Sequence, residues 1–530
     1  MPERRLLDLD PETVRTARRL AAKAGEPVVK LSKSHTTVSV ERATLRLGGL
    51  AGADHEQVPW VNHLVDAVRA SVGLEHGVSM PVFDAIRRGE APDLLTLAQK
   101  ASSGSVSFRL PDKAERGAAQ RMARREVSRG IRKIDRQRAT RDELIARIGD
   151  PKTKPWIYLI VATGDIYEDI PQAQAAAREG ADVIAVIRST GQSLLDFVPE
   201  GATREGFAGT YATQENFKLM RAALDEVGAE IGRYIRLTNY ASGLCMPEIA
   251  ALAGMERLDM MLNDSMYGIL FRDINPIRTF VDQRFSRQVH ARAGIIINTG
   301  EDNYLTTADA VDAAHTVTVS QLLYEYFAKV AGLRSWQLGL GHAFEVNPDL
   351  PDSFRIELAH ALLARELFPK APLKWMPPTK HMTGDIFRGY LLDGFFNLAG
   401  ALTNQSILLV GMMTEAVVTP FLSDRDLALQ NVRYVLNAAG SLSEDFHPPK
   451  NGFIQTRARL VLDEAVDLLD AIVYDRDEQG LPPLLTAIAD GTFGLMKRPA
   501  GGGKGLDGVI ARAPGYDNPA ITLLETGADR

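Results

Sequence analysis

The stretch that decides the fold is residues 182–193, which read DVIAVIRSTGQS. Its first half is a continuous apolar run, typical of a strand buried on both faces in a parallel sheet covered by helices. Its second half, from Arg188 to Ser193, is a basic turn with hydroxyl groups and a glycine. Such a turn offers a bound phosphate a guanidinium, short donors and close backbone approach. The stretch therefore predicts a phosphate-bearing ligand at the carboxyl end of a parallel strand, although an ordinary strand-to-helix connection with a surface arginine would read the same way.

Strand and helix patterns alternate on both sides of this stretch. The predicted strands are residues 156–162, 183–189, 234–240, 258–262, 295–298, 336–340, 373–376 and 407–412. The predicted helices are residues 171–179, 215–231, 247–253, 277–293, 308–330, 352–367, 386–401 and 424–439. Eight units over about 290 residues match a (β/α)8 TIM barrel, an α/β fold whose catalytic groups lie at the carboxyl ends of the strands. A doubly wound open sheet is the competing architecture, because alternation alone does not prove closure.

The regions on either side of this repeat have a different composition. Residues 1–150 are predicted to form a mostly helical accessory region, which short non-helical pieces interrupt, such as 36–40 and the glycine-containing turn at 48–52. It ends in an Arg-rich helix at 112–147, interpreted as a solvated face or a partner contact. The barrel is expected to span 151–447, and 448–530 to hold one amphipathic helix at 456–473 and an irregular tail. The glycine cluster at 501–505 lacks the Ser or Thr that must follow the lysine of a P-loop, so it is interpreted as flexible cover.

Composition and charge narrow the class of protein. With 530 residues, 45% of them hydrophobic and 24% charged, the chain can bury a large core. A net charge of -6 gives no general attraction for nucleic acid or an anionic membrane, so neither is an expected partner. Cys245 is the only cysteine, which fits a reducing compartment, and no apolar run reaches membrane-spanning length. A cytoplasmic location and a small-molecule substrate are therefore expected.

A closed barrel would gather the residues that follow its strands at one mouth. They supply a cation, hydroxyls, amides, an aromatic ring, carboxylates and lysines: Arg188, Gln192, Ser193, Asn239, Tyr240, Ser242, Asn263, Asp264, Tyr267, Glu301, Asp302, His342, Glu345, Lys374, Lys380, His381 and Glu415. These are the groups with which a protein binds pyridoxal phosphate and orients it.

Several of these residues have plainer alternative roles. Tyr267 suits stacking on a flat ring, but a tyrosine after a strand also serves in packing. Lys374 or Lys380 could form a Schiff base with the cofactor, or an ion pair with Asp302. His342 and Glu345 share a strand end without a third ligand at metal-site spacing, so no metal is predicted.

Two other chemistries are disfavoured. The chain has no Gly-x-Ser-x-Gly nucleophile motif and no dinucleotide-binding Gly-x-Gly-x-x-Gly after a strand. A barrel aldolase or isomerase acting on a phosphorylated substrate stays an alternative, as does a non-catalytic binding subunit.

Several long strings in this order carry a family resemblance over nearly the whole chain. They are SHTT at 34–37, PWVNH at 59–63, VIRSTGQS at 186–193, MLNDSMY at 261–267, NTGED at 298–302 and PLKWMPPTK at 372–380. On these strings the chain resembles the α subunits of lysine 5,6-aminomutase. The resemblance implies an isomerase that uses pyridoxal phosphate and adenosylcobalamin to move the terminal amino group of D-lysine or L-β-lysine from C6 to C5 by a radical mechanism.

The resemblance also implies roles for individual residues. Arg188, Gln192 and Ser193 would lie at the cofactor phosphate, and Ser242 at its pyridine nitrogen. Tyr267 would stack on the ring. Asp302 and Lys374 would face the imine and phenolic side of the cofactor and the substrate.

A partner is implied as well. In this family a smaller β subunit with a Rossmann-like domain carries the cobalamin and supplies the lysine that forms the Schiff base, in an α2β2 assembly. The present chain has no Asp-x-His-x-x-Gly, the motif whose histidine ligates cobalt. Neither Lys374 nor Lys380 would then form the Schiff base. An ornithine 4,5-aminomutase-like enzyme is the close alternative, and the sequence does not decide between D-lysine and L-β-lysine.

Overall fold

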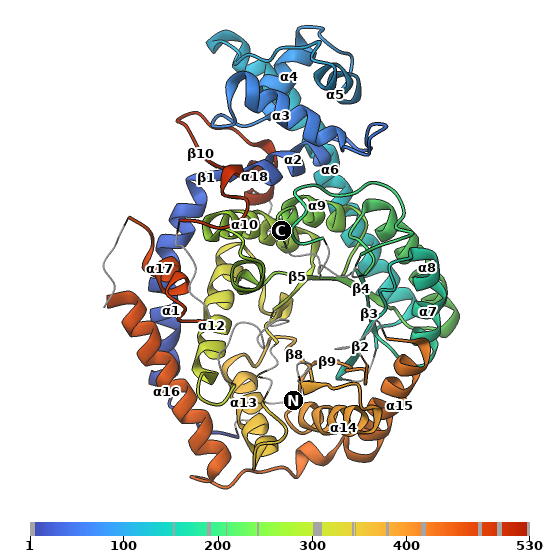
Figure 1. The fold of residues 1–530 in the computed structure, drawn as a ribbon, viewed down its shortest axis with the longest axis vertical. Helices are drawn as coiled ribbons and strands as arrows, with labels where there is room; N and C mark the ends of the chain where they lie inside the picture. The colour runs from blue at the N-terminus through green and yellow to red at the C-terminus, as the bar shows by residue number, and fades with distance from the viewer. Residues whose placement is uncertain are drawn as a thin grey trace.

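Eight parallel strands form the centre of the molecule (Figure 1). The computed structural model describes residues 6–151, 154–187, 192–207, 209–240, 243–299, 310–341, 344, 346–377, 381–414, 420–474, 480–494 and 501–526. The strands are β2 (Trp156–Ile160), β3 (Val183–Ile187), β4 (Arg236–Asn239), β5 (Met260–Leu262), β6 (Ile296–Asn298), β7 (Leu338–Gly339), β8 (Lys374–Trp375) and β9 (Ile407–Leu409).

The order of these strands is that of a barrel. Neighbours run β7-β6-β5-β4-β3-β2-β9-β8, with Tyr158 paired to Val183 and Lys374 to Ile407. At the seam between β7 and β8, a side chain on Gly341 would collide with the carbonyl group of Lys374, so the two ends approach closely there. The predicted (β/α)8 barrel is confirmed, and the alternative of an open sheet is wrong.

A helix follows each strand and covers the barrel from outside (Figure 1). These helices are α7 (Ile166–Arg178), α8 (Gln214–Ile231), α9 (Met246–Met255), α10 (Pro276–Ala293), α12 (Ala314–Val330), α13 (Ser353–Leu367), α14 (Ile386–Leu402) and α15 (Leu422–Ala439). All eight predicted helices are present. Helix α7 begins earlier than predicted, because the Asp165 side chain caps it by accepting a hydrogen bond from Tyr167 N–H, and Pro171 lies within it.

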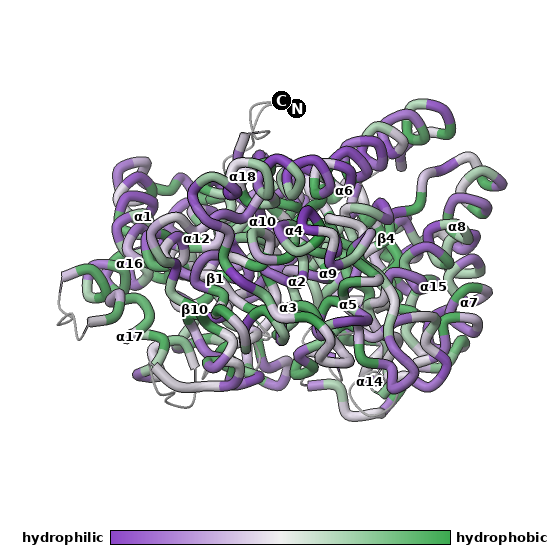
Figure 2. Tube along the Cα trace, turned by 90° about the horizontal axis from the view of Figure 1, so that it is seen from above, coloured by the Kyte–Doolittle hydropathy of each residue, from purple (hydrophilic) through white to green (hydrophobic). Residues whose placement is uncertain are grey.

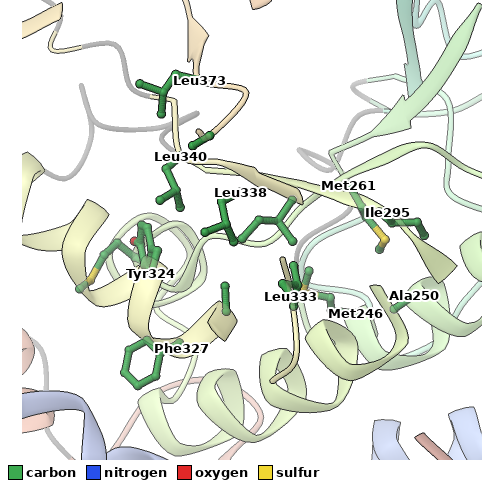
Figure 3. Packing of buried hydrophobic residues seen from close by; sticks show 14 of the residues in the cluster. Met246, Ala250, Met261, Ile295, Tyr324, Phe327, Leu333, Leu338, Leu340 and Leu373 are labelled. Atoms are coloured by element: carbon green, nitrogen blue, oxygen red, sulfur yellow. The ribbon is translucent and has the colours of Figure 1, made fainter. Parts of the chain in front are cut away.

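Apolar side chains form two layers of core. Alternate strand residues point inward, as Trp156, Tyr158, Val183 and Ala185 do, and fill the barrel. The others pack against the helices: Figure 3 shows Met261, Leu338 and Leu340 of the strand region gathered with side chains of α9 and α12. Burying one such side chain contributes about 1.5–3 kcal/mol, so this outer layer is what holds the helices on the barrel.

The chain outside the barrel is mostly helical. Before the barrel lie α1 (Pro11–Lys33), β1 (His35–Thr37), α2 (Val38–Leu47), α3 (Trp60–Val72), α4 (Ser79–Arg87), α5 (Leu94–Ser102) and α6 (Lys113–Ile148). After it lie α16 (Phe453–Tyr474), α17 (Pro483–Ala489), β10 (Val509–Ala511) and α18 (Pro519–Glu525), with β10 antiparallel to β1. Short η turns occur at Tyr267–Phe271, Ser335–Gln337, Leu442–Glu444 and Leu506–Gly508. The division into three regions at 150 and 447 stays a prediction.

Three local predictions are corrected. Residues 38–40 are helical, because the Thr37 side chain caps α2 by accepting from Val40 N–H. Residues 335–337 form a 3-10 turn before a two-residue β7, since the buried Gln337 side chain donates to the carbonyls of His290 and Ile295. The glycine cluster is not loose cover: Lys504 N–H donates to the Asp273 carbonyl, and the Lys504 carbonyl accepts from Asn275 N–H.

The Arg-rich helix α6 is not wholly a solvated face. Figure 2 shows it as a largely hydrophilic helix at the edge of the molecule. Arg141 on this helix is nevertheless buried, and its guanidinium donates to the backbone carbonyls of Ala293 and Gly294 beside the barrel. Within the described ranges, no helix is long and apolar enough to cross a membrane.

Glu357 on α13 makes the stability of the fold depend on pH. The residue is 2% exposed, and burial raises its pKa to about 8, which the Trp375 indole offsets only in part. In the unfolded chain this carboxyl releases its proton near the ordinary glutamate pKa of 4.5. Between pH 4.5 and pH 8 the unfolded chain is therefore ionised at this position while the folded chain is not, so the free energy of unfolding falls as pH rises through this window. The parent chain is expected to lose on the order of 3–4 kcal/mol of unfolding free energy between pH 5 and pH 8 through this residue, whereas Glu357→Gln, which cannot ionise, should not show this loss.

Urea unfolding at both pH values measures this effect. Glu143→Gln, at an exposed position of α6, is the matched control and should shift neither curve. Parallel pH dependences for the parent chain and Glu357→Gln would contradict the assignment.

Candidate active site

The turn after β3 contains two of the predicted site residues. Ser193 is 2% exposed, and its hydroxyl has no hydrogen-bond partner among the described residues. The Gln192 amide is engaged at both ends by Ala212: its Nε2 donates to the Ala212 carbonyl over 3.0 Å, and its Oε1 accepts from Ala212 N–H over 2.6 Å. Gln192 thus fixes the turn to the segment before α8, whereas the buried hydroxyl of Ser193 is among the buried polar atoms left without a partner in the described structure.

The turn after β4 packs directly against it. Leu244 N–H donates to the Ser193 carbonyl over 3.0 Å, and a side chain on Gly243 would collide with the Ser193 backbone. The fully buried Arg278 joins the two turns by donating to the Leu244 carbonyl over 2.6 Å and to the Asp196 carboxylate over 3.0 Å. Although burial opposes its charge, the carboxylates of Asp282 and Asp196 raise the pKa of Arg278. A fixed cation therefore holds the two turns together.

Tyr267 begins a π-helical turn after β5, η1 (Tyr267–Phe271). It is 4% exposed, its ring centroid lies 5.4 Å from that of Phe271, and its hydroxyl accepts from Arg272 Nε over 3.2 Å. These contacts do not by themselves bring Tyr267 to Ser193 or Lys374. A π-helical turn is rare and frequently marks a functional site, so the aromatic ring is placed by an unusual backbone.

A buried polar cluster supports this turn. Asp264 accepts hydrogen bonds from Met266 N–H over 2.9 Å and from the Tyr324 hydroxyl of α12. Burial raises the pKa of Tyr324 well above its usual value, and burial lowers the pKa of Arg287 to about 10. Tyr324 therefore stays a neutral donor at physiological pH and holds the start of the Tyr267 turn against α12.

Lys374 lies inside the barrel. It is 0% exposed, and its Nζ lies 5.9 Å from the ring centroid of Tyr158 and 5.7 Å from that of Tyr240. The two rings are parallel within 2°, with their centroids 6.2 Å apart. Aromatic faces stabilise a cation where water is absent, so this pair gives Lys374 a defined position in the barrel interior.

A row of asparagines crosses three neighbouring strand ends. Asn239, Asn263 and Asn298 end or follow β4, β5 and β6, and all three are fully buried. The side-chain oxygens of Asn263 and Asn298 accept no hydrogen bond from a described residue. Buried polar atoms are normally paired, so this side of the mouth offers acceptors to a ligand with N–H or O–H groups.

The structure describes nine of the predicted strand-end residues, which are Gln192, Ser193, Asn239, Tyr240, Asn263, Asp264, Tyr267, Lys374 and His381. The other eight lie outside the described residues: Arg188, Ser242, Glu301, Asp302, His342, Glu345, Lys380 and Glu415. The sequence missed Tyr158 and Asn298. Tyr158 lies within an apolar strand, where only its alternation with Trp156 could have shown that it faces the interior, whereas Asn298 ends its strand as Asn239 does.

Two further observations bear on the chemistry. Within the described part of the chain, no group of three His, Cys, Asp or Glu side chains could hold a metal ion. Cys245 is buried, and burial raises the pKa of its thiol well above the usual value, so it stays a neutral thiol.

Comparisons with known proteins agree with this architecture. Residues 7–523 match the family model described as the D-lysine 5,6-aminomutase TIM-barrel domain of the alpha subunit. A lysine 5,6-aminomutase alpha subunit of Acetoanaerobium sticklandii is 52% identical over 98% of both chains. One of Fusobacterium nucleatum subsp. nucleatum is 50% identical over 99% of both.

More distant similarities are partial. The D-ornithine 4,5-aminomutase subunit beta of Acetoanaerobium sticklandii is 32% identical over 44% of this chain and 31% of its own length. A solved structure of Yersinia pestis DHPS with a pterine-sulfa conjugate covers 54% of this chain and 93% of that chain, at 14% identity and a TM-score of 0.33, which is too weak to inform function. The match over almost the full length, on a barrel that gathers polar groups at its strand ends, shows that this chain belongs to the family of lysine 5,6-aminomutase alpha subunits, which are isomerases of the aminomutase class.

Proposed function

We propose that this chain is the barrel subunit of a lysine aminomutase that uses pyridoxal phosphate and adenosylcobalamin. The proposed reaction moves the terminal amino group of D-lysine or L-β-lysine from C6 to C5. Identity of about half over the full length supports the reaction class. The observation in the fold that carries the proposal is the buried, unpaired hydroxyl of Ser193 in the turn predicted to bind a phosphate.

The described residues fit pyridoxal phosphate. Ser193 would donate to the phosphate, and the Tyr267 ring offers a buried flat surface. Lys374, the first residue of β8, brings a cation into the barrel interior, 5.7 Å from the ring centroid of Tyr240, which follows β4. Arg188 at the phosphate, Ser242 at the pyridine nitrogen and Asp302 beside Lys374 complete the set in this proposal. When bound, the cofactor would hold the substrate nitrogen covalently and so allow its transfer between neighbouring carbons.

In this proposal the chain itself orients the cofactor and substrate and excludes water from them. Gln192, Gly243 and Arg278 fix the turns that carry Ser193, and Tyr324 fixes the turn that carries Tyr267. A radical reaction needs such fixed geometry, because a misplaced radical reacts with whatever lies nearest.

Adenosylcobalamin and the Schiff-base lysine are proposed to come from a smaller β subunit with a Rossmann-like domain, in an α2β2 assembly. The name alpha subunit implies a partner. We also propose a cytoplasmic location, on the ground of the single cysteine.

Exposed apolar side chains mark where the partner would dock. They lie at the starts of α7, α14 and α15 and in the loop before α8, which are the ends that border the mouth: Tyr167 48%, Phe207 77%, Ile386 46%, Phe387 82%, Phe421 65% and Leu422 54% exposed. These helices follow β2, β3, β8 and β9, which are adjacent in the barrel. The accessory helices cover the other side, where α2 and α6 pack on α9, and α1 and α16 pack on α12 (Figure 1). We call this apolar half of the rim the docking rim.

Removing two anchors of the docking rim is expected to weaken the complex. Truncating a hot-spot side chain costs about 2 kcal/mol or more, which is about thirtyfold in affinity, so Phe387→Ser with Phe421→Ser should raise the dissociation constant at least about thirtyfold if one of the two is a hot spot. Analytical ultracentrifugation of the chain mixed with the β subunit measures this dissociation constant. Leu460→Ser on α16, 46% exposed and remote from the rim, is the control. Equal affinities for the double variant and the control would contradict this location.

The reaction itself is tested with the reconstituted complex. The chain, a cobalamin-binding β subunit and both cofactors are incubated with D-lysine, L-β-lysine or D-ornithine, and the products are identified by mass spectrometry. We expect a 5-amino product from one or both lysine isomers and none when the β subunit is left out. Turnover of D-ornithine alone would favour the ornithine enzyme. Borohydride trapping of a phosphorylated carbonyl substrate on Lys374 would favour the aldolase alternative.

A further inference from the structure

A basic cavity lies at the end of the barrel opposite the proposed active site. It measures about 500 Å³, which is within the range of small-molecule sites. Its lining includes Trp156 at the start of β2, Arg236 at the start of β4 and Ile296 at the start of β6. These are amino ends of strands, whereas the site described above lies at their carboxyl ends. The cavity is therefore separate from that site.

Cations dominate its lining. Six basic side chains contribute, from the loop before β2, from β4, from α6 and from the end of α13 and its following loop: Arg138, Arg141, Lys154, Arg236, Arg365 and Lys370. Burial and the neighbouring Arg236 lower the pKa of Lys154 to about 7, so five of the six are fully charged at neutral pH. Two carboxylates face them, Asp142 and Asp259. Asp259 is already used, since it pairs with Arg141 over 2.7 Å and with Arg221 over 3.1 Å. The local charge is thus strongly positive in a protein whose net charge is -6.

Buried donors in this cavity lack partners. Arg236 is 7% exposed, and its Nη1 has no hydrogen-bond partner in the described structure. The indole N–H of Trp156, 6% exposed, and Nε of Arg365 are unpaired in the same way. The Arg236 guanidinium lies over the Trp156 ring, 3.6 Å from its centroid, so both donors belong to one fixed group. Leaving such donors unpaired is costly, which indicates a missing acceptor.

Nearby carboxylates do not supply that acceptor. Arg236 pairs with Asp150 through its other nitrogen, Nη2, over 2.6 Å. Within the described ranges, the hydrogen bonds of Arg365 go to the backbone carbonyls of Pro369 and Ala371, and burial lowers its pKa to about 10. Among the described residues, Arg365, Lys154 and Lys370 have no ion pair. The cavity therefore has more cationic donors than anionic acceptors.

We propose that this cavity binds a small multivalent oxyanion of the phosphate class. Guanidinium groups bind the oxygens of such an anion through paired N–H donors, and arginines from separate elements match its tetrahedral arrangement. The bound anion would link β2, β4 and the α13–β8 connection at the base of the barrel. The proposal is independent of the cofactor assignment, because it concerns the other end of the strands.

Isothermal titration of the purified full chain with inorganic pyrophosphate tests it. At low ionic strength we expect saturable binding of one anion per chain, weakened by added salt. Lys154→Ala with Arg365→Leu should weaken it at least tenfold. Arg178→Leu, which removes an exposed arginine from α7, should leave it unchanged. Because Arg365 is packed against the barrel, Lys154→Ala with Lys370→Ala is a second pair that should also weaken binding.

Tryptophan fluorescence and a second anion test where the anion binds and how specific the cavity is. Pyrophosphate should change tryptophan emission through Trp156 and Trp336, which line the cavity, and Trp336→Phe should reduce that change. Citrate should bind at least tenfold more weakly than pyrophosphate. The proposal is overturned if the parent chain shows no saturable binding up to millimolar pyrophosphate, if both cation pairs bind as the parent does, or if citrate binds equally well.

Discussion

Replacing Tyr267 by alanine in the assembled complex is expected to weaken retention of pyridoxal phosphate by about ten- to a hundredfold and to slow turnover in proportion. Stacking of a flat heteroaromatic ring on an aromatic side chain is worth about 1–3 kcal/mol by alanine substitution, and each 1.4 kcal/mol is tenfold in affinity. Tyr267 is suited to this role because it is buried and fixed by Arg272 and by the π-helical turn. Equilibrium dialysis and cofactor absorbance measure the loss.

Two matched variants separate stacking from packing. Removing a buried aromatic side chain alone costs about 3–5 kcal/mol of stability, so alanine by itself is ambiguous. Tyr267→Phe keeps the ring and should retain the cofactor, whereas Tyr267→Leu fills much of the volume without a ring and should lose it. If the leucine variant retained the cofactor as the parent does, Tyr267 would be a packing residue.

Replacing Lys374 by methionine should cost about 10²–10³ in turnover, with cofactor affinity changed by less than about threefold. This is the usual loss when one preorganised charged or hydrogen-bonding group is removed from an active site. Methionine matches the length of the lysine stem and suits the fully buried position between Tyr158 and Tyr240, so the fold should persist. Steady-state kinetics with saturating cofactors measures the loss.

The control for Lys374 is an exposed lysine of the same barrel. Lys218→Met on α8 removes a surface cation that pairs with Glu215, and it should leave turnover unchanged. Parent-like turnover for Lys374→Met would remove Lys374 from the site. Loss of the cofactor together with turnover would instead give it a binding role.

The barrel could be predicted because its strands are buried on both faces. Continuous apolar runs such as 183–187 carry that information locally, and each of the eight predicted strands has its counterpart in the structure. The errors arose where a polar side chain decides the backbone. Gln337 satisfies two carbonyls and so shortens β7, and Asp165 caps α7 ahead of Pro171. Such bonds join residues whose proximity the sequence does not show.

The site was predictable only to the level of strand ends. Ser193 and Tyr267 follow strands, so topology alone brings them to the mouth. Other features depend on how side chains of different strands and loops meet, which the sequence does not show. They are the hydrogen bonds between Gln192 and Ala212, the stacking of Tyr158 on Tyr240, and the unpaired oxygen of Asn298. The basic cavity at the barrel base was missed for the same reason, since its cations come from distant segments.

The most direct test is an experimental structure of the chain with its β subunit and pyridoxal phosphate. The proposal predicts the cofactor phosphate within hydrogen-bond distance of Ser193 Oγ, its ring against Tyr267, and its covalent bond to a lysine of the β subunit. Pyridoxal phosphate bound away from the mouth, or joined covalently to Lys374, would contradict it.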